Sequence, residues 1–100
     1  MKILLVCAGG MSTSIVMKKL QKYSDEHGLG LEHIEARGLD DYQEVYQKFD
    51  VILLGPQVSH KKAEIQKTVG DKPVGVIAPA DYALANAENI FKQVKQLLNK

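Results

Sequence analysis

The sequence contains a single cysteine, Cys7. One cysteine excludes an internal disulfide framework, and no cluster of Cys and His residues has the spacing of a zinc site. The apolar runs are far shorter than the ~20 residues needed to span a bilayer. The run that follows Lys2 is also too short for a signal peptide and ends in a glycine loop. We therefore expect a reduced, cytoplasmic protein that holds no metal and no cofactor.

The sequence also lacks an excess of one charge, since 13 Lys and Arg residues face 12 Asp and Glu residues and leave a formal charge of +1. This balance gives no reason to expect nucleic acid or an anionic membrane as the partner. The lysines are spread over several predicted helices and are expected to form solvated faces. A length of 100 residues, of which 45% are hydrophobic, indicates one compact domain over residues 1–100.

The first residues of the chain carry the strongest functional signal. An apolar run, Ile3–Val6, leads to Cys7, and small residues follow it, namely Ala8, Gly9, Gly10, Ser12, Thr13 and Ser14. In such a loop, backbone N–H groups and the dipole of the following helix attract an anion to one place. A thiol beside that place is favoured as the thiolate, which is the nucleophilic form. The segment therefore indicates chemistry on a phosphoryl group at Cys7.

Strands and helices alternate along the chain. Apolar runs predict buried strands at Ile3–Val6, Val51–Leu54 and Val74–Ile77, and alternation of apolar and polar residues predicts a more exposed strand at Leu31–Ala36. The spacing of apolar residues predicts helices from Thr13 to about Tyr23, over residues 42–49 after a cap at Asp40 or Asp41, from a cap at Ser59 to Val69, and after a cap at Asp81. The last of these helices carries an apolar stripe of Ala87, Ile90, Phe91, Val94, Leu97 and Leu98. This alternation is typical of the α/β class, with a four-stranded parallel open sheet and helices on both faces.

The topology predicts where a site would lie. In open α/β sheets, ligands bind beyond the carboxyl ends of the strands, where the strand order switches. With the strand order 2-1-3-4, three loops meet there: Cys7–Ser12, Gly55–Ser59 and Ala78–Tyr82. Each loop follows one of the three most apolar strands, which independently places the site around Cys7.

Each of these features also has a plain structural explanation. A single cysteine is often an inert buried residue, and glycines also serve tight turns between a strand and a helix. The loop is neither a Walker loop nor a dinucleotide fingerprint, because Gly-Lys-Ser/Thr and the third glycine are missing. Asp81 and Tyr82 can be a helix cap and a packing aromatic residue. Met11 can fill the core, although its place at the tip of a glycine loop favours exposure and partner contact.

Three stretches together resemble a known family: Cys7–Ser14, Val51–Val58, and Lys72–Val74 with Tyr82 downstream. They look like the IIB component of the lactose/cellobiose group of the bacterial phosphoenolpyruvate-dependent sugar phosphotransferase system, and the resemblance runs the length of the chain. It implies the fold of low-molecular-weight protein tyrosine phosphatases. It also implies that Cys7 takes a phosphoryl group from a phosphohistidine of a phosphorylated IIA protein. The group then passes to a sugar bound by a membrane IIC permease.

The resemblance implies roles for particular residues. Cys7 is the catalytic residue, and the phosphate-binding loop consists of Ala8, Gly9, Gly10, Met11, Ser12, Thr13 and Ser14. In the related phosphatases the loop reads Cys-x5-Arg, and the arginine clamps the phosphoryl oxygens. Thr13 stands at that position here, so a phosphocysteine is expected to persist until an acceptor arrives. The neighbouring, partner-facing residues are Met11, Pro56, Gln57, Val58, Asp81 and Tyr82.

Two other functions stay open at this point. A small phosphatase of the same fold would use Cys7 with Asp81 as its general acid, although the missing arginine argues against it. A non-enzymatic module that binds anions or a partner would leave Cys7 incidental. The sequence names neither the sugar nor the IIA and IIC partners. The isolated domain is expected to be a monomer that associates with the membrane only through the permease.

Overall fold

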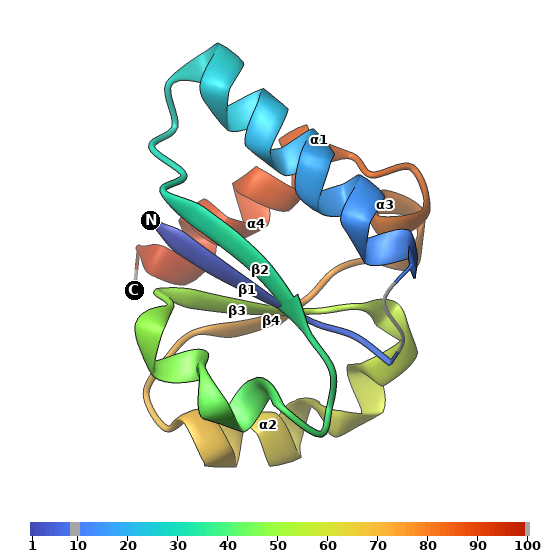
Figure 1. Cartoon of the computed structure of the whole chain (residues 1–100), viewed down its shortest axis with the longest axis vertical. Coiled ribbons are helices and arrows are strands. Elements are labelled where there is room, and N and C mark those ends of the chain that lie inside the picture. The colour runs from blue at the N-terminus through green and yellow to red at the C-terminus, as the bar shows by residue number, and fades with distance from the viewer. Residues whose placement is uncertain (9–10, 100) are drawn as a thin grey trace.

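The computed structural model describes residues 1–8 and 11–99 and, for residues 11–13, the backbone alone. The main elements alternate along the chain (Figure 1) in the order β1 (Lys2–Val6), α1 (Met11–His27), β2 (His33–Arg37), β3 (Val51–Leu54), α2 (Lys62–Val69), β4 (Val74–Val76), α3 (Pro79–Ala83) and α4 (Ala87–Leu98). Three short 3-10 helices, η1 (Tyr42–Glu44), η2 (Tyr46–Lys48) and η3 (Pro56–Lys61), lie on either side of β3 in the chain.

The four strands form one parallel sheet in the order β2-β1-β3-β4. Strand β1 lies inside the sheet, where Ile3 pairs with Ile34 of β2 on one side and with Val51 of β3 on the other. The chain runs from β1 outward to β2 and then crosses back to β3, so the strand order switches between β1 and β3. The structure thus confirms the predicted α/β class and strand order, and it puts the carboxyl ends of all four strands at one edge.

Helices cover both faces of the sheet. Figure 1 shows α1, α3 and α4 on one face and α2 with the 3-10 helices on the other. Successive side chains of a strand point to opposite faces, so Ile3 and Leu5 join the core beneath α1 and α4, whereas Leu4 and Val6 join the core above α2. Burial on both faces explains why β1 reads as a continuous apolar run.

Helix α4 packs through the predicted apolar stripe. Ile90, Phe91 and Val94 are buried, and Leu97 is half-buried. Leu98, at the end of the helix, is 40% exposed and is the one member of the stripe that faces solvent. The stripe is therefore confirmed except at its last residue.

Residues 42–49 do not form the predicted helix; they form η1 and η2. The carboxylate of Asp41 does not cap a first turn, because its Oδ1 accepts a hydrogen bond from the backbone N–H of Gly38 at 2.8 Å. Only Tyr42 and Phe49, near the two ends of the segment, are buried among its apolar side chains. The two separate turns bury the first and last of the spaced apolar side chains and leave Val45 and Tyr46 half-buried against the same core.

The caps predicted at Ser59 and Asp81 are also wrong. Ser59 lies inside η3, which begins at Pro56, and α2 begins only at Lys62. Proline is favoured in the first turn of a helix because its ring fixes φ and its missing N–H is not needed there. Helical turns therefore begin at the proline, ahead of the predicted cap.

Asp81 lies within α3, which begins with Pro79 in the same way. The chain leaves α3 through Ala85, whose φ of 49° is left-handed and interrupts the helical path. The cap of α4 is Asn86, whose side-chain oxygen accepts a hydrogen bond from the N–H of Asn89 at 3.2 Å.

Candidate active site

Cys7 follows β1 directly and is held by the sheet at its own backbone. Its N–H donates a hydrogen bond to the carbonyl oxygen of Arg37, 3.0 Å away, and the N–H of Gly55 donates one to the carbonyl of Val6, 2.9 Å away. Both bonds continue the ladders of the sheet one residue beyond the strands. The side chain of Cys7 is buried, with 4% of its surface exposed. The sheet therefore fixes the thiol at the edge where the strand order switches.

Helix α1 begins close behind Cys7, at Met11. This confirms that a helix follows the loop, and α1 is longer than predicted, at 17 residues. Ala8 and Ser14 are exposed. The predicted phosphate-binding residues Gly9 and Gly10 lie outside the described residues, as do the side chains of Met11, Ser12 and Thr13. Their parts in phosphate binding, and that of Met11 in partner contact, stay predictions.

The second predicted loop starts at Gly55, which is buried at the end of β3. A Cβ atom on Gly55 would meet Oε1 of Gln57 at 2.6 Å, so the amide of Gln57 folds back over this backbone. Pro56 is half-buried and Gln57 is exposed. Val58 is 1% exposed and packs in the core above α2. The prediction that Val58 faces a partner is therefore wrong, because η3 turns its side chain inward.

The third predicted loop begins at Ala78 and passes into α3, and it reaches the second loop through Tyr82. The ring of Tyr82 lies over Gly55, where an added Cβ would be 3.5 Å from its Cε2. Tyr82 is 7% exposed, so its ring packs between the loops. The prediction that Tyr82 faces a partner is therefore wrong. Asp81 is half-buried, and its Oδ1 accepts a hydrogen bond from Nδ2 of Asn89 at 3.1 Å. That bond ties Asp81 toward α4.

A fourth loop, after β2, also borders Cys7 and was not singled out in the sequence. Gly38 lies beside the thiol residue, because a Cβ on it would be 3.8 Å from the carbonyl oxygen of Cys7 and 3.7 Å from Oδ1 of Asp41. Nη1 of Arg37 donates to Oδ2 of Asp41 at 3.3 Å. Arg37 stands at the carboxyl end of the strand beside β1. Ligands bind beyond the carboxyl ends of the strands in such sheets, so the reasoning that selected the other loops also selects the loop at Arg37.

Ion pairs join the edge of β2 to this loop. Nε of Arg37 donates to Oε2 of Glu35, and Nε2 of His33 lies 3.1 Å from Oε1 of the same carboxylate. The hydrogen bonds from His33 and Arg37 lower the pKa of Glu35 below its ordinary value. The hydrogen bonds to Glu35 and Asp41 raise the pKa of Arg37. Both groups are thus held charged beside the backbone that anchors Cys7.

The described residues contain no group of three or more His, Cys, Asp or Glu side chains arranged to hold a metal ion. Among the same residues, no helix has the length and apolar character that crossing a membrane requires.

Fold and site together define a class of protein. This is a small α/β domain with a parallel 2-1-3-4 sheet and one cysteine between the central strand and a long helix, the architecture that low-molecular-weight protein tyrosine phosphatases share. Residues 2–93 match the family described as "PTS system, Lactose/Cellobiose specific IIB subunit". The chain belongs to this family, the IIB components of the sugar phosphotransferase system.

Relatives and solved structures agree with the family. The chain is 37% identical over 99 residues to the oligo-beta-mannoside-specific EIIB component of Bacillus subtilis, covering 97% of this chain and 95% of that protein. The solution structure of a cellobiose-specific IIB component from Borrelia burgdorferi superposes with a TM-score of 0.77 at 33% identity, covering 99% of this chain and 92% of that one. The chain therefore has a phosphoryl-transfer role in sugar uptake, and no comparison favours the small phosphatase.

A further match concerns the partners of the family. The chain is 28% identical over 101 residues to the lactose-specific EIICB component of Streptococcus mutans, and the alignment covers 90% of this chain but 18% of that protein. In that relative a IIB domain is joined to a IIC component in one chain. IIB components work together with IIA and IIC components of the same system.

Proposed function

We propose that Cys7 carries the phosphoryl group covalently, taking it from a phosphohistidine of a IIA protein and giving it to a sugar bound by a IIC permease. The observation that supports this most directly is the place of the one cysteine, at the carboxyl end of β1 and just before α1, in a chain of the IIB family. The transfer takes place on the cytoplasmic side of the permease, with which the domain associates.

The first half of the reaction moves the group onto sulfur. The thiolate of Cys7 attacks the phosphorus of the phosphohistidine, so that an S–P bond forms as the P–N bond breaks and the imidazole nitrogen keeps the electron pair. In the second half, a sugar hydroxyl attacks the same phosphorus. The O–P bond forms, sulfur leaves with its electron pair, and the hydroxyl proton passes to solvent.

The chain supports these steps mainly by positioning. Phosphoryl transfer needs attacking and leaving atoms in line, with little covalent work for the protein beyond charge stabilisation. The sheet holds the backbone of Cys7 from the Arg37 side, and α1 directs its N-terminal dipole toward the loop after Cys7. A loop without the phosphatase arginine retains the group until an acceptor is in place, which conserves the transfer energy for uptake.

The test is phosphorylation of the protein by the other proteins of the phosphotransferase system. The protein is mixed with phosphoenolpyruvate, the general relay proteins and a lactose/cellobiose-family IIA protein, and bound phosphate is counted. Wild type is expected to take one phosphate per chain and Cys7→Ser none, with similar melting temperatures. A matched control moves the thiol: Cys7→Ser/Ser59→Cys keeps one cysteine but places it on exposed η3, and it is expected to take no phosphate. Phosphorylation of either variant would contradict the proposal.

A further inference from the structure

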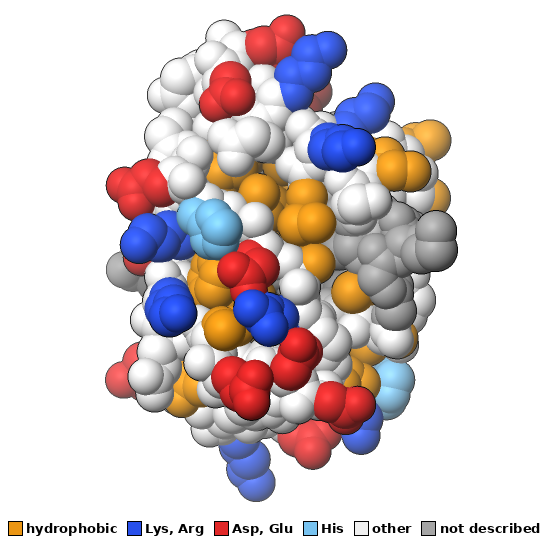
Figure 2. All heavy atoms as spheres, in the orientation of Figure 1, with side chains coloured by type: hydrophobic (Ala, Val, Ile, Leu, Met, Phe, Trp, Pro, Cys, Tyr) orange, Lys and Arg blue, Asp and Glu red, His pale blue; other side chains and the backbone are white. Residues whose placement is uncertain are grey.

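One face of α1 is exposed along most of the helix. Ile15, Lys18, Lys19 and Lys22 follow the i, i+3, i+4, i+7 spacing that puts residues on one side of a helix, and all four are exposed. We call these four residues the α1 face. Figure 2 shows basic side chains, which are lysines, gathered over α1, with acidic and hydrophobic side chains beside them.

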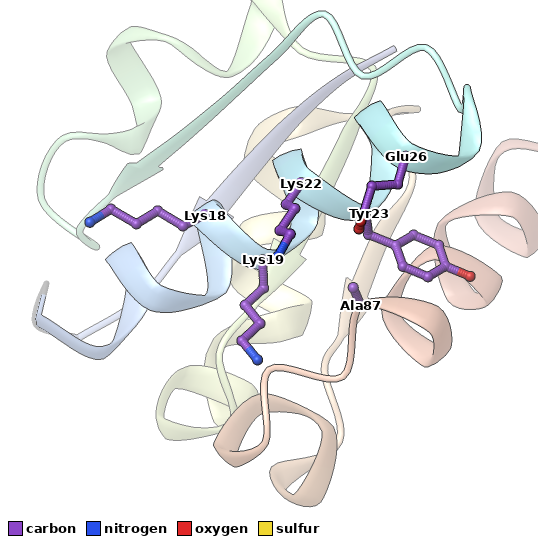
Figure 3. A pocket seen from close by; sticks show the side chains of 6 residues that line it. All are labelled: Lys18, Lys19, Lys22, Tyr23, Glu26 and Ala87. Atoms are coloured by element: carbon purple, nitrogen blue, oxygen red, sulfur yellow. The ribbon is translucent and has the colours of Figure 1, made fainter.

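The α1 face borders a groove. A cavity of 380 Å³ is lined by the three lysines together with Tyr23, Glu26 and Ala87. Figure 3 shows Lys19 and Lys22 extending from α1 on the side of Ala87, whereas Lys18 extends away from it. Helix α1 thus contributes the three lysines, Tyr23 and Glu26 to the groove, and α4 contributes Ala87 at its start.

The three lysines have no ion pair with any carboxylate in the part of the chain that the structure describes. Glu26 lines the same groove without pairing with them. Elsewhere on the surface, Lys61 pairs with Glu64 and Arg37 with Glu35 and Asp41. Lys48, Lys62 and Lys67 are also exposed and unpaired in the described part of the chain. What distinguishes the α1 face is that its three lysines stand on one side of one helix, beside the groove.

Two large apolar side chains in or next to the elements that form the groove are exposed. Ile15 is 58% exposed and stands in the first turns of α1, close behind the Cys7 loop. Leu84 is 73% exposed and lies in the turn between α3 and α4, three residues before Ala87 of the groove. Either side chain alone would be ordinary on a protein surface. Here both lie in or next to the elements that border the groove, and Ile15 also stands close to the Cys7 loop.

We propose that the α1 face, with Leu84, docks the phosphoryl donor through an acidic surface that surrounds its phosphohistidine. This rests on the proposed function. By the rise of an α-helix, Lys18 lies about 10 Å and Lys22 about 16 Å along the axis from the start of α1. The Debye length is about 10 Å at 0.1 M salt. At that salt concentration Lys18 lies within about one Debye length of the start of α1, and at 0.01 M salt, where the Debye length is about 30 Å, Lys22 does as well. At low salt the lysines therefore attract the incoming phosphoryl group, which carries negative charge, and steer the donor to Cys7.

The experiment reverses the charge of the α1 face. In Lys18→Glu/Lys19→Glu/Lys22→Glu the formal charge falls from +1 to −5, since each change removes two charges. The matched control, Lys48→Glu/Lys62→Glu/Lys67→Glu, has the same net charge but alters exposed lysines of η2 and α2, on the opposite face of the sheet. The probe is a lactose/cellobiose-family IIA protein phosphorylated on histidine, and the second-order rate constant of transfer is measured at several salt concentrations.

The α1-face variant is expected to transfer about 10-fold more slowly than wild type or worse at low salt, with the difference falling to about twofold near 0.5 M salt. The control is expected to stay within about threefold of wild type at all salt concentrations. At saturating donor the first-order rate of the α1-face variant should match that of wild type, because steering acts on encounter. Equal slowing of both variants, or no slowing of the α1-face variant, would overturn the proposal.

A binding measurement separates this proposal from the proposed function. Titration of ¹⁵N-labelled protein with unphosphorylated IIA protein should shift the amide signals of α1, whatever happens at Cys7. If α1 shifts but wild type takes no phosphate, the proposed function fails and the docking surface stands. If Cys7 is phosphorylated but α1 signals do not move, the docking surface fails alone. Binding of α1 to phosphatidylglycerol vesicles with no response to the IIA protein would also overturn it.

Discussion

The backbone N–H of Cys7 donates a hydrogen bond to the carbonyl oxygen of Arg37, with 3.0 Å between nitrogen and oxygen. This bond extends the β1–β2 ladder by one residue, so the thiol residue is still part of the sheet although the strand has ended. The Arg37 side chain is in turn held by Glu35 and Asp41. The backbone of Cys7 is therefore held by strand pairing, and the residue that accepts its hydrogen bond is itself held by two ion pairs.

The pH dependence of the free energy of unfolding tests whether the charged groups at the edge of β2 stabilise the fold. The pKa of Glu35 lies below its ordinary value of 4.5 because of hydrogen bonds from His33 and Arg37. A lowered folded-state pKa means that the carboxylate stabilises the fold above the unfolded value and that this contribution is lost as the pH falls through the folded value. Glu35→Gln is expected to lower the free energy of unfolding at pH 7 by less than about 1 kcal/mol, since solvent screens the pairs.

Urea unfolding from pH 3 to pH 7 measures this effect. The gap between wild type and Glu35→Gln should close as the pH falls below 4.5. Glu44→Gln is the control, because Glu44 is exposed and has no ion pair among the described residues. A difference in the free energy of unfolding between wild type and Glu35→Gln that stays constant with pH would contradict the lowered pKa of Glu35.

Gly55→Ala tests the contact between the second and third loops. The backbone of Gly55, with φ −63° and ψ 153°, suits alanine, and the ring of Tyr82 leaves room at 3.5 Å. Only Oε1 of Gln57, at 2.6 Å from the added Cβ, must move. We expect the free energy of unfolding to change by less than about 1 kcal/mol, because reduced freedom of the unfolded chain offsets the displacement.

The displaced Gln57 should instead affect transfer from the IIA protein. Gln57→Ala removes the same amide without altering the backbone, so the two variants should slow transfer to a similar extent. If Gly55→Ala unfolds the domain, or if it slows transfer while Gln57→Ala does not, the account of this contact is wrong.

Gly75→Ala tests packing beneath α4. An added Cβ would lie 2.7 Å from Cδ1 of Leu97 and 2.9 Å from Nε2 of Gln93, whose amide donates to the carbonyl of Val76 at 2.8 Å. Overpacking of this kind typically costs about 1–3 kcal/mol. Thermal unfolding should show a matching fall in Tm. Adding Leu97→Ala to Gly75→Ala removes one clash, so the two changes together should cost less than the sum of their separate effects.

Much of the fold could be predicted because the two central strands, β1 and β3, are buried on both faces. Val51–Leu54 is an unbroken apolar run in the sequence and a fully buried strand in the structure, so its bounds were predicted correctly. The segment 42–49 could not be predicted, because Asp41 binds Gly38 and Arg37 instead of capping a helix. Which partner a carboxylate chooses depends on tertiary contacts that spacing does not reveal.

The same limit applies to the site. The position of Cys7 followed from an apolar strand that ends before small residues. The inward turn of Val58 and the burial of Tyr82 depend on how η3 and α3 pack, and exposure in a short loop cannot be read from residue type. Arg37 was missed because it ends the least apolar strand, although ligands can bind beyond the carboxyl end of that strand as well.

Thr13→Arg tests why the loop after Cys7 retains the phosphoryl group. An arginine at this position would supply the bidentate clamp of the related phosphatases. We expect the phosphorylated variant to lose its phosphate to water faster than wild type, by about tenfold or more if the clamp acts as arginines do in other phosphoryl transfers. Decay of labelled protein after removal of the donor measures this. A folded variant whose phosphate lasts as long as that of wild type would show that the missing arginine is not what protects the group.

The most direct test of the central claim is to locate the phosphate on the chain. Wild-type protein is phosphorylated through the relay with a IIA protein, digested, and mapped by peptide mass spectrometry under conditions that preserve both S–P and N–P bonds. The account predicts one phosphate per chain, on the peptide that contains Cys7, and its loss when the permease and a sugar are added. Phosphate on His27, His33 or His60 with Cys7 unmodified would contradict it.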